Sequence, residues 1–187
     1  MKSSNEIGYK ILRPFISLYF KVKFRPTVIG GENIPKKGPI IVCGNHRHVH
    51  DQYNVMIVTK RVLHYMAKEE YFEGNKAWFY RLAGCIKVDR RIHDEKAKSE
   101  ALEVLNEGGA LGIFPEGTRN RTKELLLPFK FGAVSMAKKT DSYLVPFGIS
   151  GDYKFRSKNL VIRIREPFKI TDMDLEYANK LLTEKVA

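Results

Sequence analysis

The residues with the clearest chemical potential lie in a short stretch, GNHRHVHDQYN, that covers residues 44–54. It contains three of the chain's five histidines, His46, His48 and His50, and Asp51 follows directly. A carboxylate bound to one nitrogen of a histidine ring fixes the tautomer of that ring and raises its basicity, as general-base catalysis requires. Three imidazoles at alternate positions are also ligands of the kind that hold zinc. The third possibility is a solvated loop whose aspartate caps a helix.

The spacing of His46 and Asp51 decides whether they can form a pair. They are five positions apart, so on an ideal helix their side chains would point about 140° apart. They can meet only where a turn leads into a helix, and this is allowed because a strand is predicted to end near Gly44. A His-x4-Asp pair taken alone still favours a capping aspartate beside solvated histidines. A metal site is disfavoured because only His64 and His93 remain as further histidine ligands, and we expect neither a metal nor a cofactor.

A second polar cluster, FPEGTRNR, covers residues 114–121 and follows an apolar stretch. Gly117 would let the backbone approach a ligand closely. Arg119 offers a planar fork of donors that matches phosphate. Glu116 could orient a substrate hydroxyl or brace an arginine. Taken alone, this sequence is more often an ordinary exposed turn than a site.

The elements that must position these clusters are predicted from hydrophobic patterning. Six short apolar segments are expected to be strands, at residues 39–44, 62–67, 85–90, 110–115, 143–149 and 160–167. Five segments between and after them are expected to be helices, at residues 52–60, 76–82, 94–106, 132–139 and 173–185. This alternation indicates a single α/β domain with a largely parallel or mixed central sheet flanked by helices. Working residues of such folds lie on loops at the carboxyl ends of strands, where the stretches NHRHVHD, DRR and PEGTR all fall.

The composition indicates a globular chain rich in positive charge. Of 187 residues, 43% are hydrophobic and 29% are charged, which is typical of folded rather than disordered chains. Lys and Arg exceed Asp and Glu by 33 to 21, a net charge of +12 that suits nucleic acid, an anionic membrane surface or a phosphorylated substrate. No nucleic-acid-binding motif accompanies it, so we expect no nucleic acid partner. Cys43 and Cys85 lie in apolar stretches and are predicted to be buried free thiols.

The first 25 residues have a character of their own. The stretch IGYKILRPFISLYFKVKFR mixes aromatic and aliphatic residues with lysines and arginines, and no apolar run approaches the ~20 residues needed to span a bilayer. Pro14 limits any helix here to two pieces or a kink. The pattern is typical of a basic amphipathic segment in a membrane interface; the alternative is a first helix packed on the protein's own core. We therefore predict a membrane-interface segment at 1–25 and an α/β domain at 26–187.

Taken in order, these clusters resemble the motif blocks of the glycerophosphate acyltransferase family, and of its lysophosphatidic acid acyltransferases in particular. The resemblance covers roughly residues 38–150. The first block, Asn-His-x4-Asp, and the second, Gly-x-Ile-x-x-x-Arg, are matched at Asn45, His46 and Asp51, and at Gly84, Ile86 and Arg90. The third block, Phe-Pro-Glu-Gly-Thr-Arg, is matched at every position of 114–119, and similar stretches follow at 129–137 and 144–149. His48 departs from the family, which usually has Ser or Thr there; we expect its ring to support the loop by a hydrogen bond.

The resemblance implies an O-acyltransferase that moves an acyl group from a thioester to the free hydroxyl of lysophosphatidate, making phosphatidate for phospholipid synthesis. It implies acyl-CoA or acyl carrier protein as the donor and direct attack without an acyl-enzyme. His46 would be the general base, with Asp51 holding its other ring nitrogen. The remaining site residues would bind the acceptor: Arg119 and Arg90 its phosphate, with Lys87 a weaker candidate, and Glu116, Gly117 and Thr118 the surrounding pocket. Such an enzyme is expected on the cytoplasmic face of the cell membrane, peripheral or monotopic, against an anionic surface.

Three alternatives remain open at this point. The first is an acyltransferase of the same fold with another acceptor, such as glycerol 3-phosphate, another lysophospholipid or an aminoacyl lipid. The second is a lipid-binding or scaffold protein with an inactive site, which the presence of His46, Asp51 and Glu116 disfavours. The third is a metal-dependent hydrolase that uses His46, His48 and His50.

Overall fold

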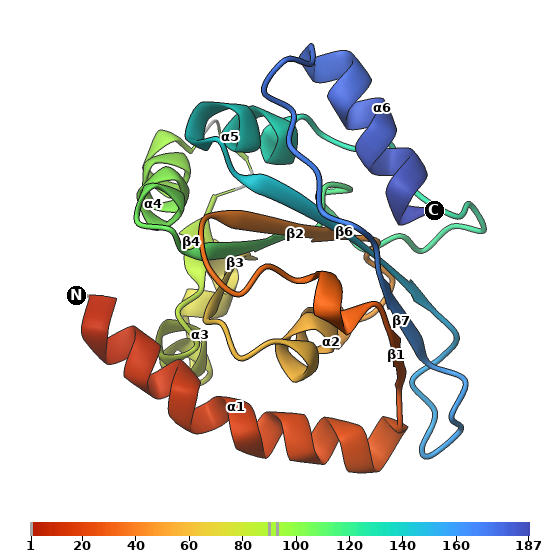
Figure 1. Ribbon diagram of the computed structural model, residues 1–187. Helices are drawn as coiled ribbons and strands as arrows, with labels where there is room; N and C mark the ends of the chain where they lie inside the picture. The colour runs from red at the N-terminus through yellow and green to blue at the C-terminus, as the bar shows by residue number, and fades with distance from the viewer. Residues whose placement is uncertain (1, 90, 93) are drawn as a thin grey trace.

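The computed structural model describes residues 2–89, 91–92 and 94–187, which fold around one seven-stranded sheet (Figure 1). The strand order is β1-β7-β6-β2-β5-β3-β4. All neighbouring strands are parallel except β6 and β7, which are antiparallel, so the sheet is mixed and largely parallel, as predicted. The strands are β1 (Thr27–Ile29), β2 (Ile40–Gly44), β3 (Leu63–Lys68), β4 (Ile86–Val88), β5 (Ala110–Ile113), β6 (Tyr143–Ser150) and β7 (Val161–Ile164).

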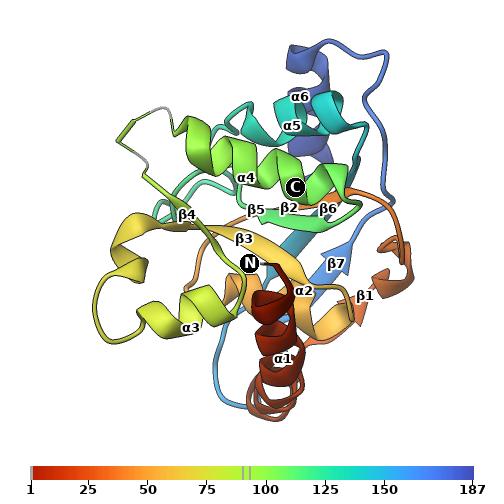
Figure 2. The same cartoon turned by 90° about the vertical axis from the view of Figure 1, so that its left-hand side faces the viewer.

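Helices cover both faces of the sheet, with α1, α2 and α3 on one face and α4, α5 and α6 on the other (Figures 1 and 2). The helices are α1 (Lys2–Phe24), α2 (Asp51–Val58), α3 (Ala77–Leu82), α4 (Glu95–Asn106), α5 (Gly132–Thr140) and α6 (Leu175–Val186), with short 3₁₀ turns η1 (Gly31–Asn33) and η2 (Glu69–Phe72). Two layers of helices over a parallel sheet require strands that are apolar on both sides. All five residues of β2 are accordingly buried.

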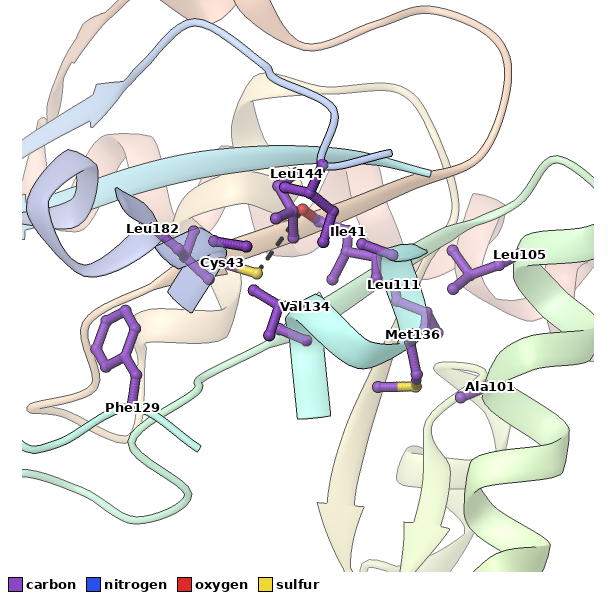
Figure 3. Close-up of a cluster of buried hydrophobic side chains, with 14 of the residues drawn as sticks. Ile41, Cys43, Ala101, Leu105, Leu111, Phe129, Val134, Met136, Leu144 and Leu182 are labelled. Atoms are coloured by element: carbon purple, nitrogen blue, oxygen red, sulfur yellow. Dashed lines mark hydrogen bonds between the residues drawn. The ribbon is translucent and has the colours of Figure 1, made fainter. Parts of the chain in front are cut away.

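The two faces of β2 belong to two separate hydrophobic clusters. Ile41 and Cys43 pack with the residues of α4, α5 and α6, whereas Ile40 and Val42 pack with those of α1 and α2. Figure 3 shows part of the first cluster, in which Cys43 lies near Val134 of α5. Alternate residues of a strand point to opposite faces, so an unbroken apolar run is what a central strand between two helical layers needs.

The predicted elements are all present, with ends that differ by a few residues. The structure also contains one strand that was not predicted, β1. Its three residues are exposed and it pairs only with β7, so neither apolar alternation nor burial marks it in the sequence. The predicted strand at 85–90 is also shorter in the structure, where β4 covers Ile86–Val88.

The N-terminal stretch forms a single helix, α1, that runs through Pro14. A proline inside a helix removes one backbone hydrogen bond, and Figure 1 shows the axis of α1 bending along its length. One face of α1 packs on the domain, burying Tyr9, Phe20 and Phe24. Arg13 reinforces this contact, since its Nε donates to the carbonyl oxygens of two residues at the end of α2 and just after it. No helix in the described ranges is both long and apolar enough to cross a membrane.

Candidate active site

His46 and Asp51 form the predicted pair. His46 lies in the loop after β2, and Asp51 is the first residue of α2. The Nδ1 atom of His46 lies 2.9 Å from Oδ2 of Asp51, and the side chains are 16% and 1% exposed. The turn between strand and helix therefore brings together two side chains that an ideal helix would separate. A neutral imidazole that donates through Nδ1 leaves Nε2 free to accept a proton.

Asp51 also holds the backbone of the loop that precedes α2. Its Oδ2 accepts hydrogen bonds from the backbone N–H groups of Arg47 and His48, each at 2.7 Å. Charge-assisted bonds of this kind are stronger than neutral ones. One carboxylate thus closes the loop and orients the imidazole within it, and these bonds lie before the helix and do not cap it.

Tyr153 binds the other oxygen of the same carboxylate and was not anticipated from the sequence. Its hydroxyl donates to Oδ1 of Asp51 at 2.5 Å and accepts a bond of 2.7 Å from the side-chain amide of Asn54. Burial and the nearby Asp51 carboxylate raise the pKa of Tyr153, so the phenol remains a neutral donor. Nothing in the local pattern around residue 153 links it to a residue 102 positions earlier.

Glu116 holds the backbone of the histidine loop. Its Oε1 accepts from the backbone N–H of His46 at 2.6 Å, and its Oε2 accepts from that of Leu127 at 2.8 Å. The carbonyl oxygen of His46 in turn accepts from the N–H of Asn120 at 2.6 Å. Both backbone groups of His46 are therefore bonded to the segment that begins with Phe-Pro-Glu-Gly-Thr-Arg. Glu116 is a positioning residue, and it braces the loop rather than an arginine.

The imidazole of His46 is also fixed by stacking. Its ring lies against Phe114 at a centroid distance of 4.2 Å and an interplanar angle of 14°. Stacking on one face and a hydrogen bond at Nδ1 leave the Nε2 edge as the part of the ring that can meet a substrate.

The rings of His48 and His50, the other two histidines of this loop, pack against aromatic side chains. Nδ1 of His48 accepts from the backbone N–H of His50 at 3.2 Å, which confirms the ring hydrogen bond expected of His48. Its ring stacks on Tyr153, and His50 lies against Phe24 of α1. Among the described residues, no group of three or more His, Cys, Asp and Glu side chains is arranged to hold a metal ion.

Two cavities meet at His46. The first cavity, of about 470 Å³, lies between the sheet and helices α4 and α5, and its lining includes Val88, Ile113, Gly132 and Met136. The second cavity, of about 530 Å³, lies on the side of α1, α2 and α3. Its lining includes Tyr9, Met56, Tyr80, Thr118 and Arg119.

The residues predicted to bind the acceptor do not all line the same cavity. Thr118 and Arg119 line the second cavity, whereas Gly117, whose positive φ of 71° suits glycine, lines the first. The Arg119 guanidinium has no hydrogen bond or ion pair with any residue that the structure describes, so its donors can reach a ligand. Arg90 lies outside the described residues.

Lys87 is not brought to the site. It alternates with buried Ile86 along β4, so its side chain is exposed, and its Nζ lies 2.7 Å from Oε1 of Glu69. It lines neither cavity. The prediction that Lys87 helps to bind a phosphate is therefore not supported by its position.

Neither cysteine is poised to act as a nucleophile. Cys43 and Cys85 are free thiols, and Cys85 lines the second cavity. Burial raises the pKa of Cys43, and it raises the pKa of Cys85 to about 12. Because the thiolate is the reactive form, His46 has no ready thiol partner for a covalent intermediate.

Comparisons with known proteins show which family the chain resembles. A family model described as Acyltransferase matches residues 25–150. A 1-acyl-sn-glycerol-3-phosphate acyltransferase from Borreliella burgdorferi is 34% identical over 137 residues, which are 72% of this chain and 54% of that protein. One from Saccharomyces cerevisiae is 28% identical over 95% of this chain and 62% of its own. The chain thus spans about half to three-fifths of the length of these relatives.

A solved structure shares the whole fold. The crystal structure of the 1-acyl-sn-glycerophosphate (LPA) acyltransferase PlsC from Thermotoga maritima superposes with a TM-score of 0.79 at 26% identity, covering 100% of this chain and 80% of that one. The family match includes both the histidine loop and the Pro-Glu-Gly-Thr-Arg segment that holds it. This chain therefore belongs to the acyltransferase family.

Proposed function

We propose that this chain transfers an acyl group from a thioester, acyl-CoA or acyl carrier protein, to the free hydroxyl of lysophosphatidate, making phosphatidate. The observation that carries this proposal is the hydrogen bond of His46 to Asp51 at the point where two cavities meet. A base between two binding sites is what a transfer between two substrates requires. The names of the relatives support lysophosphatidate as the acceptor.

The chemistry follows from the state of the imidazole. Nε2 of His46 removes the proton of the acceptor hydroxyl while the hydroxyl oxygen attacks the thioester carbonyl carbon. The new carbon–oxygen bond forms, the carbon–sulfur bond breaks, and the proton on His46 passes to the departing sulfur, which leaves as a thiol. Asp51 stabilises the imidazolium that exists between these transfers.

Arg119 is proposed to bind the acceptor phosphate. It lines the second cavity together with Arg121, so two arginines lie around one space that also borders His46. Lys68 lines this cavity too, but it is paired with Glu70. The planar guanidinium can make two parallel hydrogen bonds to phosphate oxygens. Arg90, predicted to share this role, remains a proposal.

Helix α1 is proposed to rest on the membrane that supplies the acceptor. The face that does not pack on the domain is apolar and includes Ile7, Ile11, Phe15, Leu18 and Val22, all exposed. Such a face beside lysines is typical of helices that lie in a membrane interface. Tyr9 of the same helix lines the second cavity, so the acceptor site adjoins the proposed membrane surface. We therefore propose a peripheral or monotopic protein on the cytoplasmic face.

His46→Ala should lower turnover by about 10²–10⁴-fold, because a positioned general base contributes a factor of this size. Asp51→Asn should have an effect in the same range, since the imidazolium loses its carboxylate. The measurement is transfer of a radiolabelled acyl group to lysophosphatidate from acyl-CoA and from acyl carrier protein, with glycerol 3-phosphate as the alternative acceptor. Folded His46→Ala protein with wild-type turnover would show that the base is assigned wrongly.

Tyr153→Phe should lower kcat by roughly 10- to 100-fold, the factor expected for one lost hydrogen bond to a charged group, with little change in either KM. Tyr143→Phe, the same change on a tyrosine at the start of β6 and far from Asp51, is the control. An unchanged kcat would mean that the hydroxyl of Tyr153 has no part in positioning the dyad.

Arg119→Ala should raise the KM for lysophosphatidate by about 10- to 150-fold, because a hydrogen bond to a charged group contributes roughly 1.5–3 kcal/mol. The donor KM should hardly move. Arg119→Lys should recover only part of the loss, since an ammonium lacks the two-pronged geometry. Lys87→Ala should leave the acceptor KM unchanged. Monoacylglycerol, which has no phosphate, should be a poor acceptor for wild type and hardly worse for Arg119→Ala; an equal loss with both acceptors would argue against phosphate binding.

Phe15→Glu and Leu18→Glu should each weaken binding to anionic vesicles by at least about 10-fold, because each removes roughly 1.5–3 kcal/mol of apolar burial. These side chains are 71% and 65% exposed, so the melting temperature should stay near that of wild type. Vesicle sedimentation over a range of salt measures both effects, and binding of wild type should weaken as salt screens the lysines. Tyr177→Glu on α6, across the sheet from α1, is the matched control. Equal vesicle binding by wild type and all three variants would show that the exposed face of α1 does not contact the membrane.

A further inference from the structure

We propose that the hydroxyl of Tyr65, on β3, donates a hydrogen bond to the ester carbonyl oxygen of the lysophosphatidate acceptor. Through this bond the enzyme would distinguish acceptors that carry an ester-linked chain from those that carry an ether-linked chain. This inference rests on the proposed function and goes beyond it, because it names a residue that sets which acceptor is preferred.

The hydroxyl of Tyr65 is buried without a partner. The residue is 7% exposed, and its hydroxyl oxygen has no hydrogen-bond partner among the residues that the structure describes. Buried polar groups of folded proteins are nearly always hydrogen-bonded, so this hydroxyl needs an explanation. Tyr65 lines the second cavity, which also borders His46 and Arg119. A ligand that displaces water from such a wall must supply an acceptor or leave the hydroxyl unpaired.

The phenol of Tyr65 is a neutral donor. Burial raises the pKa of Tyr65 well above its ordinary value, and the neighbouring Tyr9 of α1 raises this pKa further. The phenol therefore keeps its proton, and an oxygen atom of a ligand can accept it. Tyr9 lines the same cavity, and its hydroxyl also lacks a partner within the described part of the chain. The two hydroxyls thus mark a polar spot on this wall.

The ring of Tyr65 is fixed relative to the base. In the sheet Tyr65 lies opposite Gly112 of β5, and a Cβ at this glycine would come within 2.2 Å of the ring. The ring also stacks on Phe114 at a centroid distance of 5.8 Å, and Phe114 stacks on His46 at 4.2 Å. Phe114 thus links the phenol to the imidazole. A donor held in place in this way loses little freedom when a ligand binds.

The chemistry of the acceptor leaves one group for this donor. Lysophosphatidate has three polar groups, which are the phosphate, the free hydroxyl and the ester of its acyl chain. The proposed function places the phosphate at Arg119 and the free hydroxyl at His46. The ester is carried by the glycerol carbon next to the reacting one, so its carbonyl oxygen lies beside the reacting hydroxyl. Tyr65 holds the corresponding place beside the base, on the far side of the contact with Phe114.

The thioester carbonyl of the donor is the competing ligand of this hydroxyl. It differs from the acceptor's ester in a way that kinetics can detect, because every acceptor reacts with the same donor. Loss of a contact with the thioester would slow transfer to all acceptors alike. Loss of a contact with the ester would slow transfer only to acceptors that have one.

The test compares two acceptors, lysophosphatidate and its ether analogue, in which an alkyl chain replaces the acyl chain and no carbonyl is present. Wild type should prefer the acyl acceptor, because the ether leaves the Tyr65 hydroxyl unpaired. Tyr65→Phe should lower kcat/KM for the acyl acceptor by roughly 5- to 150-fold, the factor for a buried polar group that loses its partner. For the ether, kcat/KM should stay within about twofold, a shift of less than half a kcal/mol. The KM for the thioester should hardly change.

Two controls separate recognition from damage to the fold. Tyr65→Phe keeps the ring and removes only an unpaired hydroxyl, so the melting temperature should not fall below that of wild type. Tyr143→Phe, which lines neither cavity, should leave the preference for the acyl acceptor unchanged. Equilibrium binding to His46→Ala protein, with and without Tyr65→Phe, should show the same loss of affinity for the acyl acceptor alone, because binding does not need the base.

The outcomes distinguish this inference from the proposed function. Wild type that neither acylates nor binds lysophosphatidate would end the proposed function and the inference with it. Active wild type together with an equal loss for both acceptors in Tyr65→Phe would assign the hydroxyl to the thioester or to the fold, and the inference would be wrong. Unchanged kinetics and binding in folded Tyr65→Phe protein would also overturn it, since the hydroxyl would then contact neither substrate.

Discussion

The site depends on one buried carboxylate. Asp51 is 1% exposed, and an ion removed from water costs several kcal/mol unless hydrogen bonds replace its hydration. Its two oxygens receive four donors: two backbone N–H groups, the ring of His46 and the hydroxyl of Tyr153. These donors come from the loop after β2 and from the segment after β6. The bonds that compensate the charge therefore also fix the loop and orient the base.

The register of the sheet brings the two halves of the site together. β2 and β5 are adjacent and parallel, with Cys43 opposite Ile113, so the loops that follow them begin at the same edge. This is why Glu116 and Asn120 can bind the two backbone groups of His46. Gly44 is needed at the same edge, since a Cβ there would lie 2.3 Å from the ring of Phe147.

Much of this could be predicted from the sequence, for identifiable reasons. Because β2 is buried on both faces, it appears in the sequence as an unbroken apolar run. A helix that begins at Asp51 follows it, and this turn from strand to helix allows His46 and Asp51 to meet. Tyr153 was missed because its bond to Asp51 depends on tertiary packing and not on any local period. Glu116 was expected to orient a substrate hydroxyl or brace an arginine. Its bonds to two backbone amides could not be predicted, because a pattern of side chains does not show which amides a carboxylate will meet. Lys87 was proposed because it lies near a motif, although its alternation with apolar Ile86 along β4 places its side chain on the exposed side of the strand.

Helix α1 shows why the two early interpretations of the N-terminal stretch are compatible. Packing on the domain and contact with a membrane would exclude each other only if they needed the same face of the helix. The helix α1 has two apolar faces, one packed on the domain and one exposed. Phe20 and Phe24, on the packed face, lie 6.0 and 5.4 Å from the ring of Tyr153, whose hydroxyl holds Asp51. The helix is thus part of the packing that supports the dyad. Deleting it would uncover Tyr153 as well as any membrane contact, so only changes on its exposed face can separate attachment from catalysis.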